Sequence, residues 1–391
     1  MPRATTSRAL QIGGRLPAVV VAAGVLAGCT SQPLLDERAQ TPPLALVPVA
    51  YAGIDDGRGR FREILCRLSE HHGALLPDHR PCEEVLHELP GEIAPRDGRV
   101  NFGGSRSGLR LVIVPGQTAA CPGELGRPLR LAARHLIGLG YRVDWIEVDG
   151  SSSSADNAAS IRAAILAMPS SPDRPLVLLG YSKGTSDLLE ALTDPEVAAR
   201  VAAVVSLGGT VNGSPLADRA SDAMPDALAR LPGSQCQPGD RGGLASLRRG
   251  NRVDWLATRR LPATIRYYSL ASFATRERIS SILRPSYDAL ARIDPRNDGQ
   301  LLFYDQILPA STLLGYLNAD HWAIGLPIAR DHPELAAQVD RNAFPRELVL
   351  EAIVKYVEDD LQGVGRDRSG DAPVITTDVP QRWTSAQAGG P

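Results

Sequence analysis

The sequence predicts an α/β protein in which helices cover both faces of a parallel sheet. From residue 109 onward, short apolar runs alternate with longer segments of helical spacing. The apolar runs at 111–115 ("LVIVP") and 176–180 ("LVLLG") are continuous, which is typical of strands buried on both faces. Right-handed crossovers then place the loops after the strands along one sheet edge, where ligands bind in such folds.

The elements of this main domain, 109–362, can be placed one after another. We expect strands at 109–116, 141–148, 175–181, 201–209, 264–272 and 312–318, and helices at 125–140, 155–168, 183–192, 276–291 and 346–361. Ser154 or Asp156 is expected to cap the second helix. Residues 212–262 interrupt the pattern, and we expect an insertion that sits above the sheet as a cap. Residues 363–391 are Gly-, Ser- and Pro-rich and are expected to be disordered.

The first residues have the pattern of a targeting segment. Three arginines precede an apolar run at 16–27 that is too short to span a bilayer, so residues 1–28 are predicted to be a signal peptide. The run ends in "LAGC", which resembles the lipobox of bacterial lipoproteins. The resemblance implies a lipidated Cys29 and a membrane anchor, the alternative being an ordinary signal peptide. Because Thr30 stands where an inner-membrane retention aspartate would, we expect an outer-membrane protein facing the periplasm.

Two further segments separate this anchor from the main domain. Residues 29–54 are proline-rich and are expected to be a flexible tether. Residues 55–108 are expected to be an accessory segment of two short helices, carrying Cys66 and Cys82, packed on the main domain. With Cys121 and Cys236, the cysteines other than Cys29 number four, and an even number in an exported protein indicates disulfides. Three pairings are possible; we favour Cys66–Cys82 by locality and Cys121–Cys236 by elimination.

Composition excludes several classes of partner. The chain has 391 residues, is 43% hydrophobic and 22% charged, and has a net charge of −2, which describes a globular protein without a basic field for nucleic acid. Four histidines and Cys82 crowd into residues 71–87, but their spacing matches no familiar zinc module. We therefore expect neither a metal nor a cofactor.

The segment Gly180-Tyr181-Ser182-Lys183-Gly184 lies where a predicted strand turns into a predicted helix. G-x-S-x-G is a weak signal alone, and a plain turn serine is the alternative reading. In this strand–turn–helix context, however, the two glycines leave room for a sharp elbow that would expose Ser182 as a nucleophile. We expect the Lys183 side chain to lie in solvent.

A serine nucleophile needs a base, and the base needs an orienting acid. In the hydrolase fold that uses such an elbow the chain order is serine, acid, histidine, which leaves His321 and His332. His321 follows the last strand on a loop at its carboxyl end, so we expect it to be the base. The acid candidates are Asp294, Asp298 and Asp305. The "NDG" turn favours Asp298, with Asp294 in reserve.

These motifs carry a resemblance that covers residues 109 to about 360. "GYSKG", "NDG", "DHWAIG" and "GSPLAD" at 213–218 resemble the α/β-hydrolase fold and, within it, the serine lipases and esterases. The chain departs from the usual pattern at Thr210-Val211-Asn212, where Pro-His is common, and at Pro115-Gly116, where His-Gly is usual. The resemblance implies an oxyanion hole made by the backbone N–H groups of Lys183 and Gln117.

The sequence thus predicts an exported, lipid-anchored serine hydrolase acting on a small-molecule or lipid carboxylic ester. Ser182 would attack the acyl carbonyl, His321 would take its proton and Asp298 would orient the imidazole. Short-chain esterase and lipase activities are both open. An acyltransferase or thioesterase with the same triad is one rival, and a non-catalytic surface binding lipoprotein is another.

Overall fold

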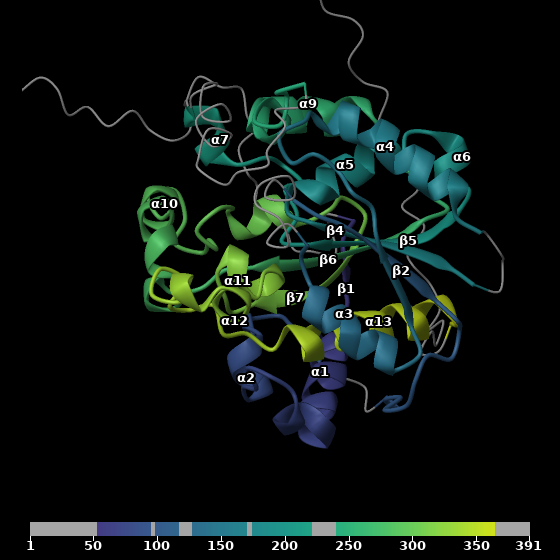
Figure 1. The fold of residues 1–391 in the computed structure, drawn as a ribbon, viewed down its shortest axis with the longest axis vertical. Coiled ribbons are helices and arrows are strands. Elements are labelled where there is room, and N and C mark those ends of the chain that lie inside the picture. The colour runs from purple at the N-terminus through teal and green to yellow at the C-terminus, as the bar shows by residue number, and fades with distance from the viewer. Residues whose placement is uncertain (1–52, 95–97, 117–126, 170–173, 221–239, 364–391) are drawn as a thin grey trace, which may run out of the picture.

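One seven-stranded sheet forms the centre of the protein (Figure 1). The computed structural model describes residues 53–94, 98–116, 127–169, 174–220 and 240–363. The strand order is β1-β7-β6-β5-β4-β2-β3, and every neighbouring pair is parallel. The strands are β1 (Asp55–Asp56), β2 (Arg110–Val114), β3 (Arg142–Trp145), β4 (Leu176–Tyr181), β5 (Val201–Leu207), β6 (Arg266–Ser272) and β7 (Thr312–Leu317). The predicted fold class is confirmed, and each of the six expected strands is present.

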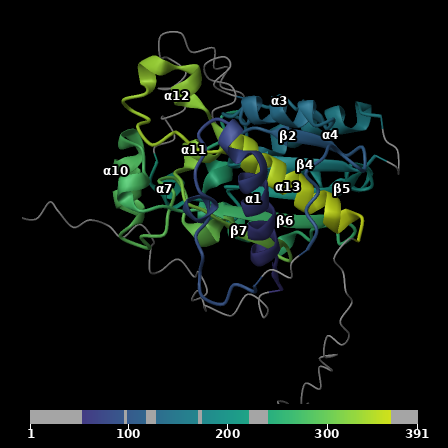
Figure 2. The ribbon, with the colours of Figure 1, turned by 90° about the horizontal axis from the view of Figure 1, so that it is seen from below.

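Helices cover both faces of this sheet because its strands are apolar on both sides. In β2, Leu111 and Ile113 join one buried cluster while Val112 and Val114 join another. The first cluster packs under α1 (Arg58–His72), α3 (Arg130–Gly138) and α13 (Arg346–Leu361). The second packs under α4 (Ser154–Ala167), α5 (Lys183–Ala191) and α6 (Pro195–Ala198). Figure 2 shows α1 and α13 lying across the first face.

The remaining helices are short and lie in the connections. They are α2 (Cys82–Val85), α7 (Pro215–Arg219), α9 (Arg249–Thr258), α10 (Arg284–Leu290), α11 (His321–Gly325) and α12 (Ile328–Asp331), with single 3₁₀ turns at Gly73–Leu75, Ala245–Leu247, Arg276–Arg278, Ser281–Leu283, Phe303–Gln306 and Pro333–Leu335. In the described part of the chain, no helix is both long and apolar enough to cross a membrane.

The N-terminal segment is part of the main domain rather than an accessory to it. β1 pairs in parallel with β7, so the segment extends the central sheet. In α1, a stripe at Phe61, Ile64, Leu65 and Leu68 is fully buried in the same cluster as α3 and α13. The segment and the residues beyond 109 therefore share one core, so the expected boundary at residue 109 does not divide two separately folded parts. The Cys66–Cys82 disulfide is present and joins α1 to α2, as expected.

Two local expectations were wrong. The helix expected at 276–291 is broken into two 3₁₀ turns and α10, because Pro285 is tolerated only in the first turn of a helix. The cap of α4 is Ser153, whose Oγ accepts a hydrogen bond from the Asp156 backbone N–H at 3.1 Å. Ser154 and Asp156 are instead the first and third residues of the helix.

Several expectations fall outside the described residues. These are the signal peptide, Cys29 and most of the tether, Gln117, Cys121, Cys236, and the tail beyond residue 363. Of the insertion at 212–262, the described parts form α7, the turn at Ala245–Leu247 and α9. Trp255 and Leu256 of α9 pack against the second cluster. The role of the insertion as a cap stays a prediction.

Candidate active site

Ser182 lies on a sharp turn between β4 and α5. Its backbone φ of 55° and ψ of −126° are values that a residue with a side chain rarely adopts. A Cβ on Gly184 would lie 2.2 Å from the Val114 carbonyl oxygen, and one on Gly180 would lie 2.5 Å from Cα of Thr185. Both glycines are therefore needed for the close packing of β4, α5 and the end of β2. This geometry is that of the sharp strand–turn–helix elbow that the sequence predicts, and not of an ordinary turn.

His321 is the first residue of α11, just after β7. Asp320 caps this helix by accepting a hydrogen bond from the Ala323 backbone N–H at 2.7 Å. The Tyr181 hydroxyl donates to the His321 carbonyl oxygen at 2.7 Å, and the two rings stack with centroids 5.4 Å apart. Held in this way, His321 places its Nε2 2.9 Å from the Ser182 Oγ. Ser182 is half-buried, whereas the His321 ring is almost fully buried.

Asp298 lies on the other side of the imidazole, in the loop after β6. Its Oδ2 is 2.8 Å from His321 Nδ1, and the residue is fully buried. The backbone N–H groups of Gln300 and Leu301 donate to Oδ1 at 2.9 and 2.7 Å. Gly299, with a φ of 87°, provides the left-handed backbone that closes this turn. The expected "NDG" turn therefore aims the carboxylate at the histidine.

Two residues that sequence reasoning missed also hold Asp298. The Ser272 Oγ donates to Oδ2 at 2.8 Å, and Gln306 Nε2 donates to the same oxygen at 3.3 Å. Gln306 is itself fixed because its amide oxygen accepts from the Ser272 backbone N–H at 2.7 Å. Ser272 ends β6 and Gln306 lies in a 3₁₀ turn eight residues beyond Asp298, so no short motif links the three.

The two rival acids lie in other environments. Asp294 pairs with the side chain of Arg296, 2.7 Å away, at the surface. Asp305 is fully buried, with an oxygen 3.4 Å from Arg249 Nη1. Burial raises the pKa of Asp305 to about 7, against the opposing effect of the Arg249 cation. Only Asp298 of the three candidates bonds to His321.

The expectation that the Lys183 side chain lies in solvent was wrong. Lys183 is fully buried, and its Nζ donates to both carboxylate oxygens of Asp187 at 2.8 and 3.0 Å. Asn157 of α4 donates to the same carboxylate at 2.8 Å. Burial raises the pKa of Asp187, although the Lys183 ammonium opposes this shift. The pair forms because residues four apart share one helix face, and the α5 face at the elbow is covered by α4.

The end of β2 passes directly beside Ser182. A Cβ on Gly116 would lie 2.8 Å from the Ser182 Cβ and 3.3 Å from its Oγ. Lys183 is the first residue of α5, where backbone N–H groups have no partner within the helix. The arrangement can thus direct the Lys183 N–H toward an oxygen beside Ser182, while Gln117 lies outside the described residues.

The protein closely resembles one solved structure, the metagenomic carboxyl esterase MGS0156. The two chains are 44% identical, the match covers 81% of this chain and 96% of the other, and the TM-score is 0.77. The chain belongs to the carboxyl esterases of the α/β-hydrolase fold. In this esterase the hydrogen-bonded serine, histidine and aspartate come from the carboxyl-end loops of β4, β7 and β6, the sheet edge at which this fold places its ligands.

More distant structures include lipase BlEst2 of Bacillus licheniformis and lipase 1 of Pelosinus fermentans. The first is 22% identical over 57% of the esterase and 89% of the lipase, with a TM-score of 0.44. The second is 12% identical over 66% and 99%, with a TM-score of 0.47. No protein-family model and no curated protein matches the chain.

Proposed function

We propose that the esterase cleaves carboxylic esters by nucleophilic catalysis, with Ser182 as nucleophile, His321 as base and Asp298 as orienting acid. The hydrogen-bond chain from Ser182 Oγ through His321 to Asp298 carries the proposal. Its distances, 2.9 and 2.8 Å, are within reach for proton transfer. MGS0156, which is 44% identical, is a carboxyl esterase by name, and this supports an ester substrate here.

The first half-reaction forms an acyl-enzyme. The Ser182 Oγ attacks the ester carbonyl carbon while His321 Nε2 takes the hydroxyl proton. The Asp298 carboxylate accepts from Nδ1–H and stabilises the imidazolium that results. The Lys183 and Gln117 backbone N–H groups would stabilise the oxyanion, each such donor being worth about 3 kcal/mol. Collapse of the tetrahedral intermediate breaks the ester C–O bond, and His321 returns the proton to the departing alkoxide.

The second half-reaction reverses these roles. Water gives a proton to His321 Nε2 and attacks the acyl carbon, and the intermediate collapses to release a carboxylic acid and free Ser182. An acyltransferase would use an alcohol in place of this water, and a thioesterase would expel a thiol in the first step. The same three residues serve all of these reactions, so product analysis separates them.

The test is hydrolysis of a series of p-nitrophenyl esters, from acetate to palmitate, by the wild type and by Ser182→Ala. We expect kcat/KM to fall at least about 10⁴-fold in the variant. Ser160→Ala is the matched control, because Ser160 is an exposed serine on α4, and it should keep full activity. Equal activity in the wild type and Ser182→Ala would contradict the assignment. Transfer of the acyl group to an added alcohol in preference to water would favour the acyltransferase.

We further propose that the esterase is exported and anchored through a lipidated Cys29, on the strength of the "LAGC" sequence at 26–29. Expression of the full chain in a Gram-negative host should place it in the outer-membrane fraction. Cys29→Ser should release it from membranes, whereas Cys29→Ser protein that stays in that fraction would contradict the anchor.

A further inference from the structure

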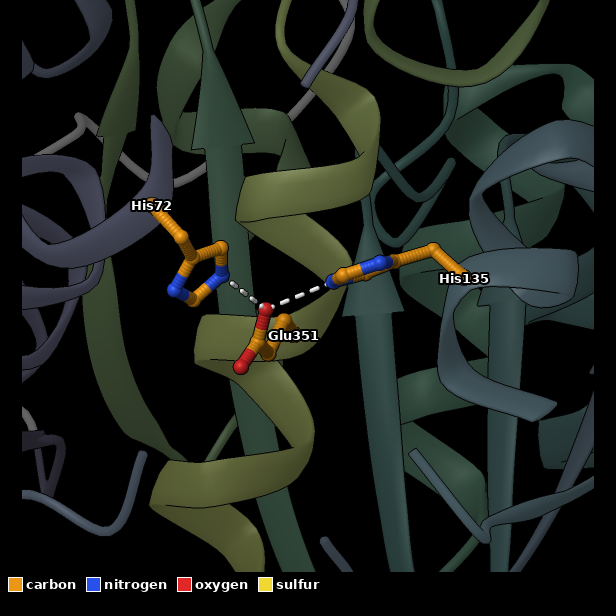
Figure 3. Close-up of side chains that lie close together, drawn as sticks. All are labelled: His72, His135 and Glu351. Carbon is orange, nitrogen blue, oxygen red and sulfur yellow. Dashed lines mark hydrogen bonds and ion pairs between the residues drawn. The ribbon is translucent and has the colours of Figure 1, made fainter. Parts of the chain in front are cut away.

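Away from the serine, three helices of the first sheet face bring two histidines and a glutamate together (Figure 3). His72 ends α1, His135 lies on α3 and Glu351 lies on α13. The Glu351 Oε2 is 2.8 Å from His72 Nε2 and 2.7 Å from His135 Nε2. One ligand atom from each residue lies within 4.8 Å of the other two.

The Glu351 carboxylate is poorly satisfied by these contacts alone. The residue is fully buried, and burying a carboxylate is costly unless it is paired and hydrogen-bonded. Both imidazoles approach the same oxygen, Oε2, while Oε1 is buried without a hydrogen-bond partner among the described residues. The cluster therefore presents a buried carboxylate with unused coordinating capacity.

The surroundings of the two histidines suit ligation as well. Their side chains are 17% and 18% exposed, so the cluster borders solvent, which could supply a further ligand. His72 Nδ1 lies 3.1 Å from Nδ1 of His71, and the His71 ring stacks on Phe102 with centroids 4.4 Å apart. A ligating histidine characteristically hydrogen-bonds through its other ring nitrogen, and His71 gives His72 such a partner.

We propose that His72, His135 and Glu351 form a zinc site that fastens α1 to α3 and α13. Two imidazole nitrogens and one carboxylate oxygen are a ligand set that Zn²⁺ accepts, with water completing a tetrahedron. At zinc–ligand distances of about 2.0–2.1 Å, the ligand atoms would stand about 3.3 Å apart. The two contacts with Glu351 would open by about 0.5 Å, and the two imidazole nitrogens, now within 4.8 Å of each other, would take the same spacing.

The proton balance of binding is simple. A zinc-bound imidazole keeps its proton on the ring nitrogen that does not bind the metal, so each histidine would ligate through Nε2 and carry a proton on Nδ1. On His72 that Nδ1–H can be donated to His71 Nδ1, 3.1 Å away. Any proton that leaves Nε2 passes to Nδ1 or to solvent.

This grouping differs from the one that the sequence offered. The sequence groups the histidines at 71–87 with Cys82, but the Cys82 sulfur is bonded to Cys66. The partners of His72 are 63 and 279 residues away along the chain, too far for any spacing rule to find.

The test is zinc binding by the full-length esterase, stripped with EDTA and titrated with ZnCl₂ by calorimetry. We expect one zinc per chain and a Tm that rises by several degrees, reversibly on chelation. His135→Gln and Glu351→Gln should each weaken binding at least about 100-fold and abolish the Tm increase. His332→Gln is the matched control, because the His332 ring pairs with Glu334 and not with a residue of the cluster, and the variant should bind zinc like the wild type.

Two results would overturn the proposal. One is a wild-type chain that binds no stoichiometric zinc, and the other is unchanged binding in both cluster variants. A zinc X-ray absorption spectrum of the wild type tests the ligands without relying on variants that could misfold. It should show nitrogen and oxygen ligands, whereas sulfur ligands would assign the metal to cysteines and contradict the site.

Discussion

Five groups within the protein hydrogen-bond to the carboxylate of Asp298: His321, Ser272, Gln306 and the backbone of Gln300 and Leu301. Asp298→Asn would replace the acceptor for Nδ1–H by an amide that can favour the wrong tautomer. We expect kcat to fall about 10⁴-fold with KM little changed, measured on p-nitrophenyl acetate. Asp294→Asn, at the rival acid that pairs with Arg296, should leave both constants unchanged. The reverse result would assign the acid to Asp294.

A second residue-scale prediction concerns pH. Asp305 has a pKa of about 7 in the folded protein, whereas an unfolded aspartate has a pKa of about 3.9. Between these two pKa values, Asp305 is protonated in the folded state and ionised in the unfolded state. The free energy of unfolding therefore falls as the pH rises from the lower value to the higher one, and it stays constant above the higher value. Asp305→Asn should remove that loss.

Urea unfolding of both proteins from pH 4.5 to 8 measures this effect. The free energy of unfolding of the variant, relative to the wild type, should rise with pH by on the order of a few kcal/mol. Because the asparagine carries no charge to pair with Arg249, the two proteins also differ in their free energy of unfolding by an amount that does not depend on pH. A difference that stays flat across the range would show that Asp305 is ionised in the fold.

Individual residues were predictable where a local pattern encoded them. Ser182 lies between two required glycines, Asp298 sits in a turn that needs Gly299, and His321 follows a clear strand. Ser272, Gln306 and the buried state of Lys183 had no such pattern, because their partners come from other elements.

At the scale of elements, the elbow can be tested through its glycines. Gly184→Ala would push a Cβ to 2.2 Å from a backbone oxygen that cannot move freely. We expect a loss of stability of about 1–3 kcal/mol and a large loss of kcat. Gly138→Ala, at the end of α3, would place its Cβ more than 4 Å from every described atom outside its chain neighbours and the nearby backbone of its own helix. It should instead be neutral or stabilise by up to about 1 kcal/mol. Thermal unfolding and ester turnover together measure both variants.

The ion pair within α5 gives another element-scale prediction. Lys183→Met would leave the Asp187 carboxylate buried without its cation, although Asn157 of α4 would still donate to it. We expect a loss of about 3–5 kcal/mol in the free energy of unfolding. Adding Asp187→Leu should recover much of this loss, because the uncompensated charge is then gone. Chemical denaturation of the single and double variants provides the measurement. A double variant no more stable than Lys183→Met would contradict the argument.

Elements with a continuous pattern were predicted well. The last helix was expected at 346–361 and α13 has those bounds, because its apolar residues recur on a face that is buried against the sheet. The prediction of one helix at 276–291 was wrong, because Pro285 and tertiary contacts such as that of Ser281 with Asp340 favour separate turns.

For the whole molecule, the Cys66–Cys82 disulfide closes a loop of 16 residues at the start of the fold. Because α1 belongs to the central core, loosening this loop should affect global stability. We expect the Cys66→Ser, Cys82→Ser double variant to lose about 3 kcal/mol, as the entropy of an open loop predicts. A single cooperative transition at lower denaturant should be seen by circular dichroism. If α1 unfolded first and the rest of the protein unfolded in a separate second transition, the segment would be an accessory to the main domain.

The general architecture was predictable from the alternation of apolar runs and helical segments, but the extent of the domain was not. β1 is only two aspartates long, and nothing in "DD" indicates a strand. Its pairing with β7 arises because α1 buries its apolar stripe against that side of the sheet. The same long-range packing brings His72, His135 and Glu351 together.

The most direct test of the account is covalent labelling of Ser182. A fluorophosphonate reacts only with an activated serine, and mass spectrometry of the digested esterase locates the adduct. We predict a single adduct, on Ser182, formed by the wild type and by His332→Gln but not by His321→Ala. A folded wild-type protein that forms no adduct, or forms one on another serine, would contradict the catalytic role of Ser182.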